Sequence, residues 1–194
     1  MRRLRPLLRS DAMLVFLDFE ASSLAKKSYP IEVAWVFEDG RDESHLIRPP
    51  LQWDDWDAEA EAIHHIPRAT LEAEGTPHDI VARRMVEVLS GHALFASAPS
   101  WDGKWLSALL RAAKLPRHAL RLRDTEDAQR ETATAILRDA VPAANLGVAV
   151  ADVITLAEVR DRDVPTHRAL ADARDEWERW CAVKRAAEAR AAER

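Results

Sequence analysis

The sequence predicts an α/β fold in which helices flank a mixed β-sheet. Three apolar segments follow one another with short connections between residues 14 and 47, which favours an antiparallel three-strand meander. Two further short apolar segments alternate with segments of helical period, which adds strands to a mixed sheet and helices that cover it. The length of 194 residues, of which 47% are hydrophobic, suits one compact domain.

The first half of the chain supplies the meander. Each of its three expected strands is short and apolar, with β-branched or aromatic residues: 14–17, 31–37 and 44–47. The turn Asp39-Gly40 closes the second strand, and Pro49 and Pro50 stop the third. Residues 51–75 are polar and irregular and leave room only for short helical pieces.

The second half alternates helices with strands. Thr76 is expected to be an N-cap with Pro77 at the first helical position, and Gly91 ends the helix that follows. The remaining elements are expected as strand 93–96, helix 105–113, strand 119–122, helical region 126–159 and a last helix from Thr166.

The chain is expected to divide into an arm, one domain and a tail. Residues 1–12 are basic and lack periodicity, residues 13–183 carry the folded pattern, and residues 184–194 are rich in Ala, Arg and Glu and are expected to fray. The single Cys181 excludes an intramolecular disulfide and a multi-cysteine zinc site. A reducing, cytoplasmic location is the simplest expectation.

Composition also limits the partners. No apolar run near the start approaches the roughly 20 residues of a membrane span, so no membrane contact is expected. The formal net charge is −5. A nucleic acid would therefore need a local basic strip, or metal ions that neutralise the acidic residues facing it.

Five polar side chains stand out, although each has a simple structural interpretation. Asp18 and Glu20 lie two apart at the end of the first strand, so they share a face, and alone they are best interpreted as a loop-capping pair. Asp102 follows strand 93–96 at a helix start, where an acid complements the helix dipole. His167 and Asp172 open the last helix and suit a solvated helix start.

Taken together, these side chains indicate metal-dependent chemistry. The four acids fall at the ends of elements next to the sheet, and converging carboxylates repel one another unless a cation intervenes. Oxygen ligands alone select a hard cation such as Mg²⁺ or Mn²⁺. Two such ions about 3.5–4 Å apart stabilise the attacking and leaving oxygens of a phosphoryl displacement. His167 adds a base that deprotonates water near neutral pH.

At these residues the sequence resembles the DEDDh 3′–5′ exonucleases, which include proofreading subunits, ribonuclease T and oligoribonuclease. The first motif is similar to residues 17–24, the second to Trp101-Asp102, and the third, the most specific, to residues 167–173. The resemblance implies a ribonuclease-H-like fold, two Mg²⁺ ions that Mn²⁺ replaces, and release of nucleoside 5′-monophosphates. It also implies a general base at His167 and metal ligands at Asp18, Glu20, Asp102 and Asp172.

The same resemblance suggests residues that hold the substrate. They are Ala21 and Ser22 by their backbone, Leu24 as a wedge against the terminal base, and His64 and Trp101 beside the site. Packing in the core is an equally good interpretation of Leu24 and a better one of Trp101. The family places a His-Asn pair before the second-motif Asp, where this chain has Ser97 and Ala98. That departure leaves the rate in question.

Three hypotheses of function remain. The first is a metal-dependent 3′–5′ exonuclease that acts on single-stranded or 3′-terminal DNA or RNA. The second is a weakened, nucleic-acid-binding module that keeps the exonuclease fold, as Ala98 suggests. The third is an acidic interaction protein in which the motif match is coincidental. Some relatives are dimers, so a homodimer also stays open.

Overall fold

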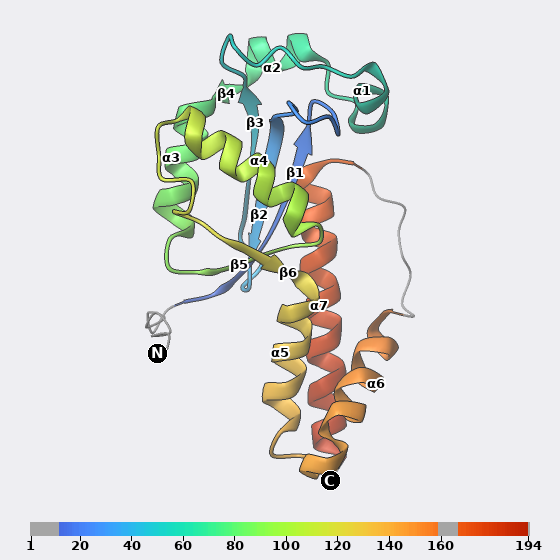
Figure 1. Cartoon of the computed structure of the whole chain (residues 1–194). Coiled ribbons are helices and arrows are strands. Elements are labelled where there is room, and N and C mark those ends of the chain that lie inside the picture. Colours follow the sequence, from blue (N-terminus) through green and yellow to red (C-terminus); the bar gives the residue numbers. More distant parts are fainter. Residues whose placement is uncertain (1–11, 159–166, 194) are drawn as a thin grey trace.

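A computed structural model of the chain describes residues 12–158 and 167–193, with a six-stranded mixed sheet at its centre (Figure 1). Its strands are β1 (Leu14–Ala21), β2 (Pro30–Phe37), β3 (Asp42–Arg48), β4 (Thr76–Pro77), β5 (Ala93–Ala96) and β6 (Leu122–Asp124). Their order is β4-β3-β2-β1-β5-β6. β1, β2 and β3 form an antiparallel meander, and β5 pairs parallel with β1 and β6. The predicted α/β class and mixed sheet are confirmed.

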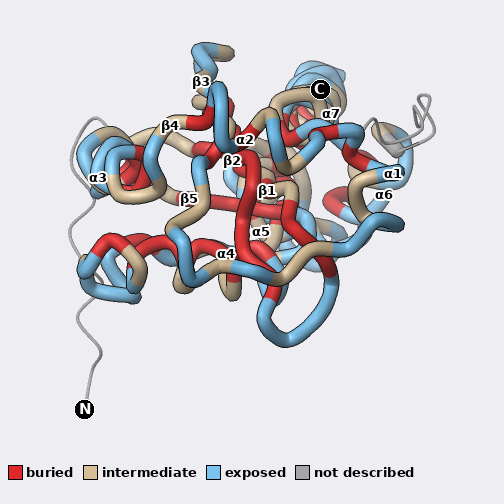
Figure 2. The backbone as a smooth tube through the Cα atoms, turned by 90° about the horizontal axis from the view of Figure 1, so that it is seen from above, coloured by how far each residue is buried: buried red, intermediate tan, exposed pale blue. Residues whose placement is uncertain are grey.

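Helices pack on both faces of this sheet. They are α1 (Ala58–His64), α2 (Arg68–Glu74), α3 (His78–Leu89), α4 (Pro99–Ala112), α5 (Thr125–Leu137), α6 (Leu146–Glu158) and α7 (Ala169–Ala192), with a 3₁₀ turn at Ala143–Asn145. Buried residues gather along the central strands (Figure 2). Among the described residues, no helix has the length and apolar character needed to cross a membrane.

The two faces of β1 have different partners. Side chains on one face join the core formed with α3 and α4; they are Val15, Leu17 and Phe19. On the other face, Phe16 packs against Trp180 of α7 with ring centroids 5.6 Å apart. Successive side chains of a strand point to opposite faces, so Asp18 and Glu20 continue the Phe16 face. The carboxylates of β1 therefore lie on the α7 side of the sheet.

Helix α7 connects the sheet with a helical bundle that extends beyond it (Figure 1). Near its start, Ala169 and Ala173 are buried against Ala34 and Val36 of β2. Farther along, Val183 and Ala187 join a second core with residues of α5 and α6. Small side chains let the helix approach the sheet closely, so the beginning of α7 is held at the end of β1.

Two expected element boundaries near β3 and β5 were wrong. Thr76 does not cap a helix but pairs with Ile47 in the two-residue strand β4, and α3 begins at His78. A residue before proline is driven towards extended backbone, and the edge of β3 accepts that backbone. The strand expected at 119–122 lies at Leu122–Asp124, because parallel pairing sets Leu122 opposite Leu94.

The last helix differs from expectation at both ends. It begins at Ala169, so His167 precedes the first turn instead of lying in it, while the expected start at Thr166 lies outside the described residues. At the other end, fraying was expected from residue 184. The helix instead continues to Ala192, since Ala187 is fully buried in the core shared with α6. The expected arm lies within residues 1–12, of which 1–11 are not described.

Gly75 provides a test of the packing between α2 and β3. A Cβ atom there would lie 2.4 Å from the carbonyl oxygen of Leu71 and 2.7 Å from the backbone nitrogen of Arg48. Because both are backbone atoms, we expect Gly75→Ala to lower the free energy of unfolding by about 1–3 kcal/mol in urea titrations. Gly147→Ala is the control: a Cβ there meets no atom within 4 Å, so it should be neutral or stabilise α6 by up to about 1 kcal/mol. Equal stability of both variants would contradict the close approach.

Candidate active site

The five side chains that the sequence singled out come from three elements that meet at one end of the sheet. Asp18 and Glu20 end β1, Asp102 lies in the first turn of α4, and His167 and Asp172 flank the start of α7. Ligand atoms of Glu20, His167 and Asp172 all lie within 4.8 Å of one another. Glu20 thus lies in one group with two residues that follow it by 147 and 152 positions, and this group could hold a metal ion.

Asp102 faces this group from the α4 side. It is only 2% exposed, and its Oδ2 atom has no hydrogen-bond partner among the described residues. Hydrogen bonds from the backbone at Ala98 and at Phe19 of β1 lower its pKa, which places its carboxyl against β1. A buried carboxylate oxygen without a donor is costly unless a proton or a cation meets it.

Burial and like charge raise the pKa values of these carboxyls. Burial is the largest cause for Asp18, whose pKa lies well above its usual range, with further increases from the charges of Asp102, Glu20 and Asp172. The pKa of Glu20 rises to about 8, chiefly through burial and then through the charge of Asp172. Burial raises the pKa of Asp102 to about 7. In the absence of a cation, protons therefore occupy this site near neutral pH.

The donor set fits a divalent cation of the hard type. Glu20 and Asp172 offer carboxylate oxygens and His167 offers a ring nitrogen, Asp102 adds a buried carboxylate oxygen without a partner, and the described residues place no thiol in this group. A bound cation replaces the protons and removes the mutual repulsion of the carboxylates. Of the expected ligands, Glu20 and Asp172 lie in this group, and Asp18 lies near enough to Asp102, Glu20 and Asp172 that their charges raise its pKa.

Glu176 is a fifth carboxyl at this site, and the sequence interpretation missed it. It lies one turn after Asp172 on the same face of α7, is 7% exposed, and its charge raises the pKa of both Asp18 and Asp102. Thr125 hydrogen-bonds its side chain, and Arg179 forms an ion pair with it. The spacing of four from Asp172 was the available signal. It was hidden among the other charges of this helix.

A second missed feature fixes where α7 begins. Glu32 of β2 accepts hydrogen bonds from Arg168, at 2.8 Å from Nη2 and 3.1 Å from Nε, and from the backbone N–H of Ala169 at 3.0 Å. Glu32 also lies directly opposite Glu20 in the β1–β2 ladder. This buried carboxylate ties the start of α7 to the strand beside Glu20. His167 enters this connection in the left-handed backbone region, with φ of 52°.

Of the residues expected to hold the substrate, some are exposed and others are buried. Leu24 is 70% exposed and Trp101, which precedes Asp102, is 39% exposed, so both present apolar surface to solvent; Ala21 is buried at the bulge that ends β1. Ser22 is fully buried, and its N–H donates to the carbonyl of Tyr29 while its hydroxyl donates to Asp55. Its polar groups are used within the loop, which leaves none for a nucleotide.

His64 is buried beneath the loops that flank the site. Its Nδ1 accepts a hydrogen bond from the N–H of Ile66 at 3.0 Å, so the proton of the neutral ring lies on Nε2. That Nε2 atom is buried and has no partner in the described part of the chain. Burial lowers the pKa of His64, while Glu61 and Glu32 act in the opposite direction. The ring is therefore a neutral donor held near Glu32.

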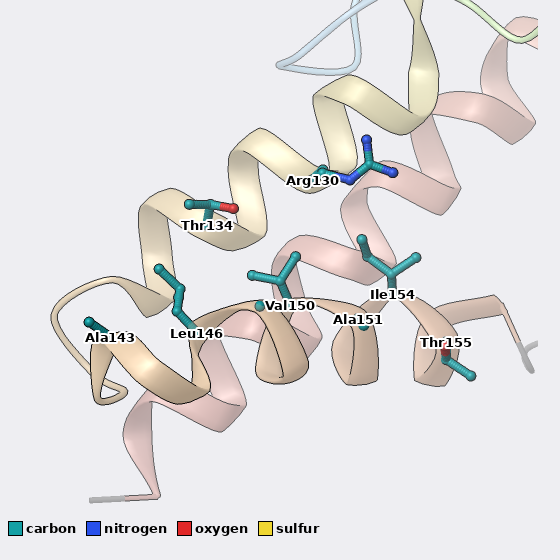
Figure 3. A pocket seen from close by; sticks show the side chains of 9 residues that line it. Arg130, Thr134, Ala143, Leu146, Val150, Ala151, Ile154 and Thr155 are labelled. Carbon is teal, nitrogen blue, oxygen red and sulfur yellow. The ribbon is translucent and has the colours of Figure 1, made fainter.

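A separate groove lies within the helical bundle, between α5 and α6 (Figure 3). Its volume is about 540 Å³, and none of the expected metal-binding, catalytic or substrate-binding residues lines it. Small and apolar side chains of α6 form one wall, and Arg130 is the only charged lining residue. With no acid, histidine or cysteine in its lining, this groove offers no group for hydrolysis.

Comparisons with known proteins show which solved structures share this fold. No protein-family model and no curated protein matches the sequence. Solved structures do match: exonuclease I from E. coli in a zinc-bound complex with single-stranded DNA has a TM-score of 0.60 and 16% identity, over 86% of this chain and 39% of that one. The chain has the fold of exonuclease I.

Two other exonuclease I structures agree with this fold. One, without ligand, has a TM-score of 0.62 and 17% identity over 90% of this chain and 42% of its own. The other, from Methylocaldum szegediense, has a TM-score of 0.57 and 19% identity over 87% and 40%. The chain thus spans about two fifths of the length of these exonuclease I chains. The ribonuclease-H-like fold implied by the three motifs is confirmed.

The raised carboxyl pKa values lead to a test of the site in metal-free protein. The folded state holds more protons than the unfolded state between about pH 4.5, the usual pKa of Glu20, and about pH 8. The free energy of unfolding should therefore fall as the pH rises through this window. Asp18→Asn should flatten the dependence, measured by urea titration in chelator, whereas Asp152→Asn on exposed α6 should not. Identical slopes for all three proteins would show that these carboxyls are not coupled.

The link between Glu32 and the start of α7 leads to another test. Glu32→Gln keeps the shape but loses the charge that Arg168 and the N–H of Ala169 share. We expect the free energy of unfolding to fall by about 1.5–3 kcal/mol, the usual worth of hydrogen bonds to a charged group. The matched control is Glu72→Gln, which removes an exposed ion pair with Arg68 and should cost less than about 0.5 kcal/mol. A loss no larger than that of the control would remove Glu32 from this role.

Proposed function

We propose that this chain is a metal-dependent 3′–5′ exonuclease that removes nucleotides from the 3′ end of a nucleic acid and releases nucleoside 5′-monophosphates. The observation that carries the proposal is the convergence of Glu20, His167 and Asp172 within 4.8 Å at the site that Asp18 and Asp102 complete. The fold shared with exonuclease I supports it. These motif residues come from three elements, and packing of the core does not by itself explain why their polar side chains meet at one place.

The proposed roles follow from the chemistry of each side chain. Asp18, Glu20, Asp102 and Asp172 hold two divalent ions, which when bound activate the attacking water and stabilise charge on the leaving oxygen. His167 is the exposed member of its group, so its ring takes the proton of the attacking water and exchanges it with solvent. Glu32 and Arg168 keep that ring beside Glu20.

Single-stranded DNA is the substrate that the comparisons favour. E. coli exonuclease I has been captured with a dA16 oligonucleotide and with single-stranded DNA. In this chain, the exposed Leu24 and Trp101 offer apolar surface on which a terminal base stacks next to the acids. Backbone at Ala21 contacts the same nucleotide, whereas the buried ring of His64 does not reach it and supports the neighbouring loops. RNA remains the alternative substrate for the degradation panel.

One observation favours a second candidate, a nucleic-acid-binding module with weak or no hydrolysis. Ala98 is the N-cap of α4, with no side-chain hydrogen bond to the first turn that carries Asp102. The related exonucleases have an asparagine at this position, and an asparagine caps a helix well. Binding of DNA without turnover in Mg²⁺ would select this candidate over the enzyme.

The experiment is a degradation panel with 5′-labelled single-stranded DNA, duplex DNA and RNA in Mg²⁺, Mn²⁺ or EDTA. Asp172→Asn should abolish shortening from the 3′ end, and His167→Ala should slow it by roughly 10²–10⁴, the usual worth of a positioned base. Glu59→Gln, an exposed acid of α1, is the control and should match the wild type. EDTA should stop the reaction and added Mg²⁺ restore it. Full activity in EDTA, or in Asp172→Asn, would refute the proposal.

A further inference from the structure

A basic pocket lies beside the candidate active site and has no role in the proposed chemistry. Its volume is about 470 Å³, and its charged lining consists of four cations and the single acid Asp54. The cations are Lys26, Lys27, Lys104 and Arg111. The formal net charge of the chain is −5, so these cations form a local positive patch that the overall charge does not reveal. A concentration of positive charge in a concave site attracts anions.

Three segments line the pocket: the loop that follows β1, residues 52–54, and helix α4, which also carries Asp102 in its first turn. Lys104 and Arg111 lie seven residues apart on one stripe of α4, with Ala108 between them. The Nζ atom of Lys104 donates to the carbonyl of Ala25 at 2.7 Å and to Oγ of Ser28 at 2.9 Å. These bonds fasten the loop that follows β1, including Lys26 and Lys27, to α4 two residues after Asp102.

The charges of the pocket cations are not balanced by ion pairs in the described part of the chain, unlike those of several arginines elsewhere. In the described part of the chain, Lys26, Lys27, Lys104 and Arg111 take part in no salt bridge. By contrast, Arg84, Arg123 and Arg174 each bind a carboxylate. Lys26, Lys27 and Arg111 are exposed, so their charges are available to a ligand.

Aromatic surface accompanies these charges. Trp53 lines the pocket and stacks on Tyr29 with ring centroids 5.0 Å apart. The exposed ring of Trp101, which precedes Asp102 in the chain, has its centroid 4.8 Å from Nζ of Lys104. Cations that follow a groove beside aromatic rings match a single-stranded nucleic acid, whose phosphates and bases alternate. An acidic peptide offers charge but no bases to stack.

We propose that this pocket binds the phosphodiester backbone of a single strand, upstream of the nucleotide held at the acids. The inference rests on the proposed function, because the strand's 3′ end must lie beside Asp18 and Asp102. Arg111 lies nine residues beyond Asp102, about 13 Å along α4. A substrate of one nucleotide does not span that length, so the pocket favours longer strands.

The first test measures binding in EDTA, where no hydrolysis is expected, by fluorescence anisotropy of a labelled 12-nucleotide single-stranded DNA. Lys27→Ala/Arg111→Ala should weaken binding about tenfold at low salt and reduce the slope of log affinity against log salt by about 1.4, or 0.7 for each lost phosphate contact. The control Arg83→Ala/Arg138→Ala changes the net charge equally on exposed surface elsewhere and should leave both quantities unchanged. An equal loss in both variants would overturn the proposal.

The second test separates this inference from the proposed activity. In Mg²⁺, the ratio of kcat/KM for the 12-mer to that for a single-nucleotide p-nitrophenyl ester should fall about tenfold in Lys27→Ala/Arg111→Ala. If Lys27→Ala/Arg111→Ala hydrolyses the 12-mer with the affinity, salt slope and kcat/KM ratio of the wild type, the assignment of the pocket is overturned and the exonuclease proposal stands. If the wild type shows no turnover but Lys27→Ala/Arg111→Ala still weakens binding of the 12-mer, the exonuclease proposal is overturned and the pocket assignment stands. Displacement of the 12-mer by millimolar inorganic phosphate would indicate a small-anion site and overturn the strand assignment.

Discussion

Repulsion among carboxylates at the end of β1 is the constraint on which the rest of the structure depends. Burial and neighbouring charge raise the pKa of Asp18, Glu20 and Asp102 together, so each of these groups resists ionisation where it lies. Such a site destabilises the fold unless packing elsewhere offsets it. The central strands supply that packing, with Phe16 and Trp35 fully buried on opposite faces of the sheet.

Helix α7 is the element that turns this constraint into a site. Its start is fixed by Glu32, which lies opposite Glu20, and its small residues approach β2 closely. Asp172 and Glu176 then fall on the helix face that meets Asp18. Its far half is buried against α5 and α6, and that burial holds the whole helix in register. Because packing holds the helix at both ends, it offsets the repulsion between the carboxyls of the helix and those of β1.

The charges of the protein are separated along α4. Its first turn carries Asp102 towards the acids, while its outer stripe carries Lys104 and Arg111 towards the loop that follows β1. An overall negative charge is therefore compatible with the proposed binding of a strand of phosphates, which would meet the pocket cations and the proposed metal ions. The net charge alone hides this arrangement, because it adds groups that face different directions.

The α/β class, the meander, and the common face of Asp18 and Glu20 could all be predicted from the sequence, because strand and helix periods are local properties of the chain. The resemblance of its motifs added Asp102, His167 and Asp172 to the candidate site. The positions of Glu32 and Glu176 beside these residues, and the burial of Ser22 with its polar groups engaged, became visible only in the folded chain. Those contacts depend on strand register and on helix placement across more than a hundred residues. No local pattern encodes which distant backbone a side chain will meet.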